Sequence, residues 1–154
     1  MTKLTIPVYK ECDNIRQFAS NIAKVAHLGQ VDKGGNPYFD HVWRVGMRLC
    51  DDTGRVVGFL HDLLEDTDWI EEDLRRTNLP TEVIDAVVCM TRGFESYEDY
   101  IDRVSKNPIA RGVKIMDLSD NMDMTRIKAS LTDKDIQRLQ KYHKAYLFLI
   151  NTKS

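Results

Sequence analysis

Histidine and aspartate side chains stand inside two strongly apolar stretches of the sequence. His61 and Asp62 lie in the middle of residues 56–64, and Asp117 lies within residues 113–118. A helix that is apolar on all sides is buried. A carboxylate buried there without a partner would cost several kcal/mol or give up its charge. These three side chains therefore need partners inside the fold.

Two kinds of partner would satisfy these groups. The first is a hydrogen bond or an ion pair in the core, for example with a lysine or an arginine. The second is a cation held jointly by His61, Asp62 and Asp117, because imidazole and carboxylate ligands together suit Mn, Fe or Zn rather than Ca. Consecutive helical side chains point about 100° apart, so a cation would lie on the flank between His61 and Asp62 and take further ligands from other helices. The spacing alone leaves both interpretations open.

Three more side chains favour the cation. His41 follows a glycine-rich loop and stands near the start of its helix, where it could supply a ligand from a third helix. Glu65 is four residues after His61, and Asp66 is four residues after Asp62, so the two acids lie one helical turn further on. A carboxylate one turn from a metal can orient or deprotonate a water molecule.

Polar and basic residues near these groups indicate a phosphorylated ligand. Asn121 is four residues after Asp117 and can reach the same cavity. Lys33 lies in the glycine-rich loop, and Lys114 lies one turn before Asp117. Both lysines offer positive charge to phosphate.

Helices are expected to position all of these residues. Apolar side chains recur at three- and four-residue spacing, and no alternating stretch of strand length is bounded by hairpin turns. Ser96 with Asp99 and Thr132 with Asp135 fit the capping-box spacing, and Asn107 precedes a proline. The sequence predicts an all-α fold of about eight helices, near residues 15–26, 38–49, 54–65, 69–76, 81–90, 97–105, 108–124 and 133–150.

The overall composition narrows the classes of partner. The chain has 154 residues, with 22 Lys and Arg against 24 Asp and Glu, and a formal net charge of −2. It therefore has no excess of positive charge to bind a nucleic-acid backbone. Its apolar runs are too short to span a membrane, and its first residues do not form a signal peptide. We expect a single domain over residues 1–154 that is cytoplasmic, binds neither nucleic-acid polymers nor membranes, and is compatible with a homo-oligomer.

The motifs around these residues follow one another in a recognisable order over residues 26–121. They are Ala26-His27-x-Gly29-Gln30-x-x-Lys33-x-Gly35-x-Pro37-Tyr38-x-x-His41, Leu60-His61-Asp62-x-x-Glu65-Asp66-Thr67 and Val113-Lys114-Ile115-x-Asp117-x-x-x-Asn121. Together they resemble the HD-domain metal-dependent phosphohydrolases. More narrowly, they resemble the hydrolase domain of RelA/SpoT proteins and the stand-alone small alarmone hydrolases, which act on nucleotides.

This resemblance implies a compact all-α HD-domain bundle that holds one Mn²⁺. The implied metal ligands are His41, His61, Asp62 and Asp117. The implied catalytic acids, which assist the attacking water, are Glu65 and Asp66. The implied substrate-binding residues are Lys33, Tyr38 and Asn121, to which Lys114 adds positive charge. The implied reaction removes the 3′-pyrophosphate from guanosine tetra- or pentaphosphate.

The sequence departs from this branch around the substrate. Asp32 stands where relatives commonly have a basic residue, and an acid there disfavours a highly anionic substrate. Two alternatives therefore stand beside the alarmone hydrolase. One is an HD phosphohydrolase that acts on another nucleotide or on a nicotinamide dinucleotide phosphate. The other is a non-catalytic module that senses a nucleotide, although the retained pair of Glu65 and Asp66 argues against it.

Three aromatic side chains near the motifs are expected to be structural. His27 is expected to hydrogen-bond a ligand or the loop backbone. Tyr97 and Tyr100 are three residues apart on one helical face. They are expected to pack against the fold, with stacking on a nucleotide base as the alternative.

Overall fold

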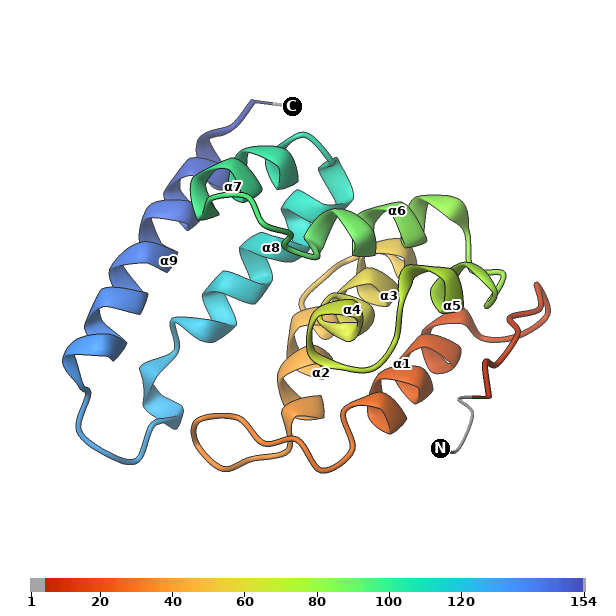
Figure 1. Ribbon diagram of the computed structural model, residues 1–154, viewed down its shortest axis with the longest axis horizontal. Helices are drawn as coiled ribbons and strands as arrows, with labels where there is room; N and C mark the ends of the chain where they lie inside the picture. Colours follow the sequence, from red (N-terminus) through yellow and green to blue (C-terminus); the bar gives the residue numbers. More distant parts are fainter. Residues whose placement is uncertain (1–4, 154) are drawn as a thin grey trace.

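Residues 5–153 are described by the computed structural model, and they form nine α-helices and one short 3-10 helix (Figure 1). The bounds are α1 Ile15–Ala26, α2 Tyr38–Met47, α3 Asp52–Leu60, α4 Leu63–Asp66, α5 Glu71–Arg75, α6 Thr81–Met90, α7 Tyr97–Ser105, α8 Pro108–Asn121, η1 Met124–Arg126 and α9 Asp133–Asn151. This part of the chain has no strand, only an isolated bridge between Val31 and Pro37. The predicted all-α fold of about eight helices is confirmed, since α4 and α5 are little more than single turns.

Side-chain caps fix where the last three α-helices begin. The hydroxyl of Ser96 accepts a hydrogen bond from the backbone N–H of Asp99 at 3.1 Å, and Asn107 caps α8 in the same way. Thr132 and Asp135 form a complete capping box at the start of α9. These caps satisfy N–H groups that the first turn of a helix leaves without intrahelical partners. All three starts agree with the sequence prediction.

Helix α3 lies at the centre of the packing. It contacts α1, α2, α6 and α8, and its residues from Val56 to Leu60 are all buried. It meets α2 at two glycines, where a Cβ on Gly58 would lie 2.6 Å from the Cα of Gly46. Because neither residue has a side chain, the two backbones approach closely. This approach brings the rings of His41 and His61 to a centroid distance of 5.3 Å.

The prediction of one continuous helix over residues 54–65 is wrong, because this segment is divided between two helices. Helix α3 ends at Leu60, and a separate helix, α4, begins at Leu63. The backbone of Asp62, with φ −98° and ψ 3°, leaves the helical region. The apolar pattern continues through both helices, so periodicity could not reveal the break. The chain therefore turns at His61 and Asp62.

Two other helices end two or three residues before the predicted position. Helix α2 ends at Met47 rather than at residue 49. Helix α8 ends at Asn121 rather than at residue 124, and the short helix η1 follows it. Helix ends fray and are the least regular part of a helix, so periodicity places them within a few residues.

Helix α8 separates the core from α9. It packs on α2, α3 and α6 and also contacts α7 and α9, which lie on the side of the molecule away from α1 (Figure 1). Side chains on α8 can thus face both the core and α9. Among residues 5–153, no helix is both long enough and apolar enough to cross a membrane.

Candidate metal centre

Two imidazoles and two carboxylates converge at the centre of the fold. The Nε2 atom of His41 lies 3.2 Å from Asp117 Oδ1 and 3.6 Å from Asp62 Oδ2. The Nε2 atom of His61 lies 3.4 Å from Asp117 Oδ1 and 2.9 Å from Asp62 Oδ2. His41 comes from the start of α2, His61 and Asp62 from the turn between α3 and α4, and Asp117 from α8. The structure thus brings together all four predicted ligands.

Each of the two imidazoles uses its Nδ1 atom for a hydrogen bond. Its Nε2 atom is then directed at the point where the four side chains converge. The Nδ1 atom of His61 lies 2.7 Å from the carbonyl oxygen of Gly58, and the Nδ1 atom of His41 lies 2.7 Å from Asp120 Oδ2. Both Nδ1 atoms therefore donate. Within residues 5–153, both Nε2 atoms are buried without a hydrogen-bond partner. A buried nitrogen lone pair facing carboxylate oxygens is unfavourable unless a cation lies between them, so this group of side chains fits a divalent metal.

The electrostatics of the cluster lead to the same requirement. Burial lowers the pKa of His41, but the carboxylates of Asp117, Asp120 and Asp62 outweigh it and raise the pKa to about 11. Burial likewise lowers the pKa of His61, and Asp62 and Asp117 raise it to about 10. The negative charge of the carboxylates is thus large enough to hold protons on both imidazoles at neutral pH. A divalent cation would supply the same compensation.

Lys114 and Asn121 contact the centre through Asp117. The ammonium of Lys114 lies 2.8 Å from Asp117 Oδ2, and the amide of Asn121 donates to Asp117 Oδ1 at 2.7 Å. Burial lowers the pKa of Lys114, but the Asp117 charge holds it well above its ordinary value. The sequence predicts that Lys114 offers its charge to phosphate, and in the structure its ammonium is paired with Asp117. The i, i+3 spacing on α8 explains the pair.

Tyr38 lies beside the same cluster. Its hydroxyl donates a hydrogen bond to Asp62 Oδ2 at 2.7 Å. Its ring lies 5.1 Å from the ring of His27 and 5.4 Å from that of His41, measured between centroids. His27 is buried, and its Nδ1 atom is hydrogen-bonded to the side chain of Gln30 at 2.8 Å. The tyrosine therefore links the loop before α2 to the carboxylate of Asp62.

The acids Glu65 and Asp66 follow Asp62 on the short helix α4. Glu65 Oε1 accepts a hydrogen bond from the backbone N–H of Arg92 at 2.8 Å. Partial burial of its carboxyl group, together with the charge of Asp62, raises the pKa of Glu65 above its ordinary value. The same two causes raise the pKa of Asp66. Both residues remain exposed to solvent, so they lie at the rim of the centre and not within it.

A cavity of about 250 Å³ opens next to His41. Three of the predicted substrate residues line it, namely Lys33, Tyr38 and Asn121, and Lys114 is not among its lining residues. The ammonium of Lys33 lies 3.5 Å from Asp135 Oδ1 on α9, and the lysine side chain is 61% exposed. The cavity therefore lies between the loop before α2, the end of α8 and the first half of α9.

The cavity wall also contains residues that the sequence analysis did not select. They are Arg44, Arg126, Arg138 and Tyr142. Arg44 is three residues after His41 on α2, so helical spacing could have revealed it. Arg126 and Arg138 come from η1 and α9, beyond the motifs that span residues 26–121. Arg126 is placed at the cavity by η1, which follows α8 directly, and it pairs there with Asp120 and Asp123. Arg138 reaches the cavity through the packing of α9 on α8, which no local pattern reveals.

Asp32, the acid that departs from the resemblance, folds its own loop. Its Oδ1 atom accepts hydrogen bonds from the backbone N–H groups of Gly34 at 2.8 Å and Asn36 at 2.9 Å. Such bonds are typical of an Asx turn. Asp32 also lines the cavity, so its negative charge remains close to any bound anion.

Asp120 is a further residue of the site that was not predicted from the sequence. It is fully buried and contacts the side chains of His41, Arg44 and Arg126. It lies three residues after Asp117, which places both acids on one face of α8. That spacing was a usable signal.

The two tyrosines of α7 differ in how far they are buried. Tyr100 is buried, and its hydroxyl donates to the carbonyl oxygen of Met90 at 2.6 Å. It packs in the core, as predicted. Tyr97 is partly exposed, with the ammonium of Lys141 4.6 Å from the centre of its ring.

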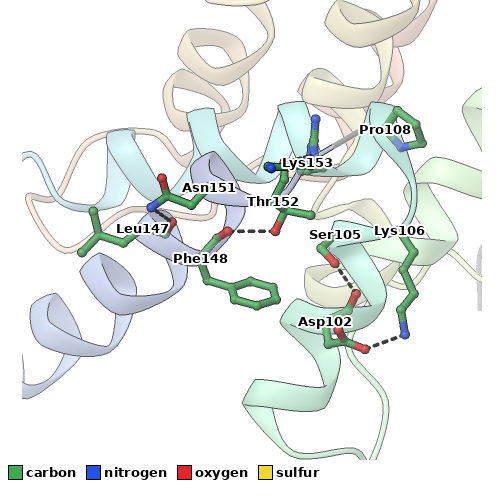
Figure 2. A pocket seen from close by; sticks show the side chains of 10 residues that line it. Asp102, Ser105, Lys106, Pro108, Leu147, Phe148, Asn151, Thr152 and Lys153 are labelled. Atoms are coloured by element: carbon green, nitrogen blue, oxygen red, sulfur yellow. Dashed lines mark hydrogen bonds and ion pairs between the residues drawn. The ribbon is translucent and has the colours of Figure 1, made fainter.

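A larger cavity, of about 860 Å³, lies elsewhere, between α7, the start of α8 and the end of α9 (Figure 2). Several of its polar groups are bonded to one another or to nearby backbone. Lys106 pairs with Asp102 at 2.6 Å, and Thr152 donates to the carbonyl of Phe148 at 2.8 Å. It has none of the histidines of the metal centre. Size alone therefore does not make it the functional site.

Comparison with known proteins supports the fold and the sequence resemblance. No protein-family model matches the chain. A GTP pyrophosphokinase of Streptomyces coelicolor is 30% identical over 131 residues, which cover 75% of this chain and 16% of that protein. The chain thus spans about a sixth of the length of this relative.

A solved structure described as a metazoan ortholog of SpoT that hydrolyzes ppGpp superposes with a TM-score of 0.72. The two chains are 19% identical, and the match covers 93% of this chain and 89% of the other. The resemblance to RelA/SpoT-type proteins that the motifs predicted is therefore confirmed at the level of the fold, and this chain is an all-α bundle of the HD type.

Proposed function

We propose that this chain is a metal-dependent phosphohydrolase that removes the 3′-pyrophosphate of guanosine tetra- or pentaphosphate. The main support is the convergence of His41, His61, Asp62 and Asp117, in which two buried Nε2 atoms face carboxylate oxygens. The cavity beside His41, with its lysine and arginine side chains, supports a phosphorylated substrate. The metazoan SpoT ortholog of the same fold is described as hydrolysing ppGpp.

The four converging residues would hold the cation, which we propose to be Mn²⁺. A divalent cation in such a position supplies positive charge to a phosphoryl group and makes water more acidic. Asp117 is oriented by Lys114 and Asn121, and Asp62 is oriented by the hydroxyl of Tyr38. These three partners restrict the carboxylate rotamers, and so the ligand oxygens are fixed before the cation binds.

Glu65 is the proposed acceptor of the proton from the attacking water, with Asp66 beside it. A general base works best when its pKa lies close to the operating pH. The pKa of each carboxyl group is raised by partial burial and by the charge of Asp62. Their position on α4, one turn beyond Asp62, places them at the rim where water enters.

Lys33, Tyr38 and Asn121 would bind the substrate in the cavity, together with the arginines of its wall. Charged hydrogen bonds from arginine to phosphate are strong and directional. Arg138 from α9 lies opposite the loop that carries Lys33, and both contact Asp135. Phosphate groups that enter the cavity would thus be held between the loop and α9.

A second function is favoured by the position of two charged groups. Asp32 lines the cavity, and Lys114 is paired with Asp117, so the cavity has less free positive charge than the motifs alone indicate. A less anionic substrate would fit this balance better. The same metal centre would then hydrolyse another nucleotide or a nicotinamide dinucleotide phosphate.

A panel of nucleotides with added Mn²⁺ separates these functions. The panel contains guanosine tetraphosphate, nucleoside monophosphates and a nicotinamide dinucleotide phosphate, and both pyrophosphate and orthophosphate are measured. Pyrophosphate release from guanosine tetraphosphate is expected. Orthophosphate release from another member would instead establish the second function, and ligand binding without turnover would establish a sensing module.

A further inference from the structure

We propose that Asp120 is a positioning residue that sets the metal affinity of this chain through His41. The inference rests on the metal centre of the proposed function but not on the identity of the substrate. Asp120 is fully buried, and its Oδ2 atom lies 2.7 Å from His41 Nδ1. It lies on α8, whereas His41 lies on α2, so one carboxylate connects two of the three segments that supply the proposed ligands.

The bond to Asp120 determines which nitrogen of His41 can bind a cation. When Nδ1 carries the hydrogen that is donated to Asp120, the lone pair of the neutral ring is on Nε2, which faces Asp62 and Asp117. A carboxylate partner also makes the imidazole a stronger ligand than a neutral partner does. His61 has such a neutral partner, the carbonyl oxygen of Gly58. The two histidine ligands are therefore supported differently.

Three arginines surround the carboxylate of Asp120. The Nη1 atom of Arg48 lies 3.5 Å from Oδ1, and the other two arginines form hydrogen bonds that hold the carboxylate in place. Arg44 contacts both oxygens, with Nε 2.9 Å from Oδ1 and Nη2 3.0 Å from Oδ2. The Nη2 atom of Arg126 lies 3.1 Å from Oδ2 and 2.6 Å from the backbone oxygen of Asp120. Because both oxygens are engaged, the carboxylate cannot rotate away from His41. A buried charge fixed in this way is well suited to orient a ligand.

A purely structural role for Asp120, which would only dock α2 on α8, makes a different prediction. The docking of α2 on α8 depends on the bonds of Asp120 to the arginines as much as on its bond to His41. The metal affinity depends on the bond to His41 alone. Asp123 provides a matched comparison, because its carboxylate contacts Arg126 at 3.2 Å and, within residues 5–153, forms no hydrogen bond to a histidine. Removing its charge perturbs the arginine and leaves His41 unchanged.

The test compares Asp120→Asn with Asp123→Asn by calorimetric titration of the metal-free proteins with Mn²⁺. Asn keeps the shape of the side chain but loses the charge. We expect the Mn²⁺ affinity to fall about 10–100-fold in Asp120→Asn and to stay near the wild-type value in Asp123→Asn. Wild-type Mn²⁺ affinity in folded Asp120→Asn would overturn the proposal. If the unmutated protein binds Mn²⁺ but turns over no nucleotide, and the affinity still falls in Asp120→Asn, only the proposed function would be contradicted.

Nuclear magnetic resonance of the wild-type protein tests the same proposal if Asp120→Asn does not fold. In the chain loaded with diamagnetic Zn²⁺, the Nδ1 hydrogen of His41 is expected to be observable and protected from exchange with water. The Nδ1 hydrogen of His61 is the internal reference, since it is held by Gly58. A His41 hydrogen that exchanges much faster than that of His61 would overturn the role of Asp120.

Discussion

The Nε2 atom of His61 lies 2.9 Å from the Oδ2 atom of Asp62, although the two residues are consecutive in the chain. On a continuous helix their side chains would point about 100° apart. They meet because α3 ends at Leu60 and α4 begins at Leu63. The turn between the helices directs both side chains to the point that His41 and Asp117 also reach. The helix break is thus part of the metal centre.

The close contact of α2 and α3 predicts a sensitive position at Gly58. A Cβ there would lie 2.6 Å from the Cα of Gly46, so Gly58→Ala must push the two helices apart. We expect a loss of about 1–3 kcal/mol in the free energy of unfolding, together with weaker Mn²⁺ binding. Urea unfolding and metal titration measure the two effects.

Gly112→Ala is the matched control for this substitution. Gly112 lies in α8, and a Cβ there would have no other heavy atom within 4 Å. We expect it to stabilise the chain by about 0.5–1 kcal/mol, because alanine is the better helix former. If the two substitutions changed the free energy of unfolding equally, close helix packing would not explain the effect of Gly58→Ala.

The position of Glu65 at the rim predicts that it acts on the reaction and not on the metal. In Glu65→Gln the Mn²⁺ affinity should stay within about twofold of the wild type, while turnover falls about 10²–10⁴-fold, as for loss of a general base. Steady-state kinetics at saturating Mn²⁺ measure the rate. Glu72→Gln, on the exposed side of α5, is the control. Loss of metal in Glu65→Gln would assign Glu65 to the metal ligands instead.

Arg138 is expected to act in substrate binding. Its side chain is 23% exposed on the cavity wall and pairs with Asp135 at 2.6 Å. A lost hydrogen bond to a charged group costs about 1.5–3 kcal/mol. Arg138→Gln should therefore raise KM about tenfold or more, with kcat nearly unchanged. Lys144→Gln, at an exposed position of the same helix, should change neither. A fall in kcat with constant KM would be inconsistent with this role.

The charges of the centre predict how the metal-free protein responds to pH. The pKa of His41 is raised to about 11 and that of His61 to about 10, from ordinary values of about 6.5. Their contribution to stability is therefore complete below about pH 6.5 and is lost as the pH rises through 10 and 11. The pKa values of Asp62 and Asp117 are lowered, so their contribution is present above about pH 4 and is lost in acid.

The metal-free chain should consequently be most stable between about pH 4 and 6.5. Urea unfolding at a series of pH values measures this profile. Saturating Mn²⁺ should reduce the loss of stability above pH 6.5, because the cation replaces the protons on the imidazoles. A metal-free protein that gains stability between pH 7 and 9 would contradict the described charges.

The proposed metal ligands could be selected from the sequence because they violate its apolar pattern. His61, Asp62 and Asp117 are polar residues in stretches that must be buried, and burial without a partner is costly. His41 could be added since a loop rich in glycine and a helix start precede it. The structure places these four residues together, as predicted.

Other parts of the site depend on contacts that no local pattern encodes. The turn at His61 and Asp62 interrupts an apolar pattern that continues across it. Lys114 has two available partners, a substrate phosphate and Asp117, and the sequence alone does not reveal the ion pair with Asp117 that the structure contains. Arg138 reaches the cavity because α9 packs against α8, which is a contact between distant segments of the chain. Arg126 reaches it because η1 turns back after α8 and pairs the arginine with Asp120.

The most direct test of this account is a crystal structure of the chain grown with Mn²⁺, with anomalous scattering used to locate the metal. The account predicts one anomalous peak, about 2.0–2.3 Å from a nitrogen or oxygen of each of His41, His61, Asp62 and Asp117, as in other protein sites with these ligands. A fully occupied peak elsewhere in the chain, or the absence of any peak at saturating Mn²⁺, would contradict it.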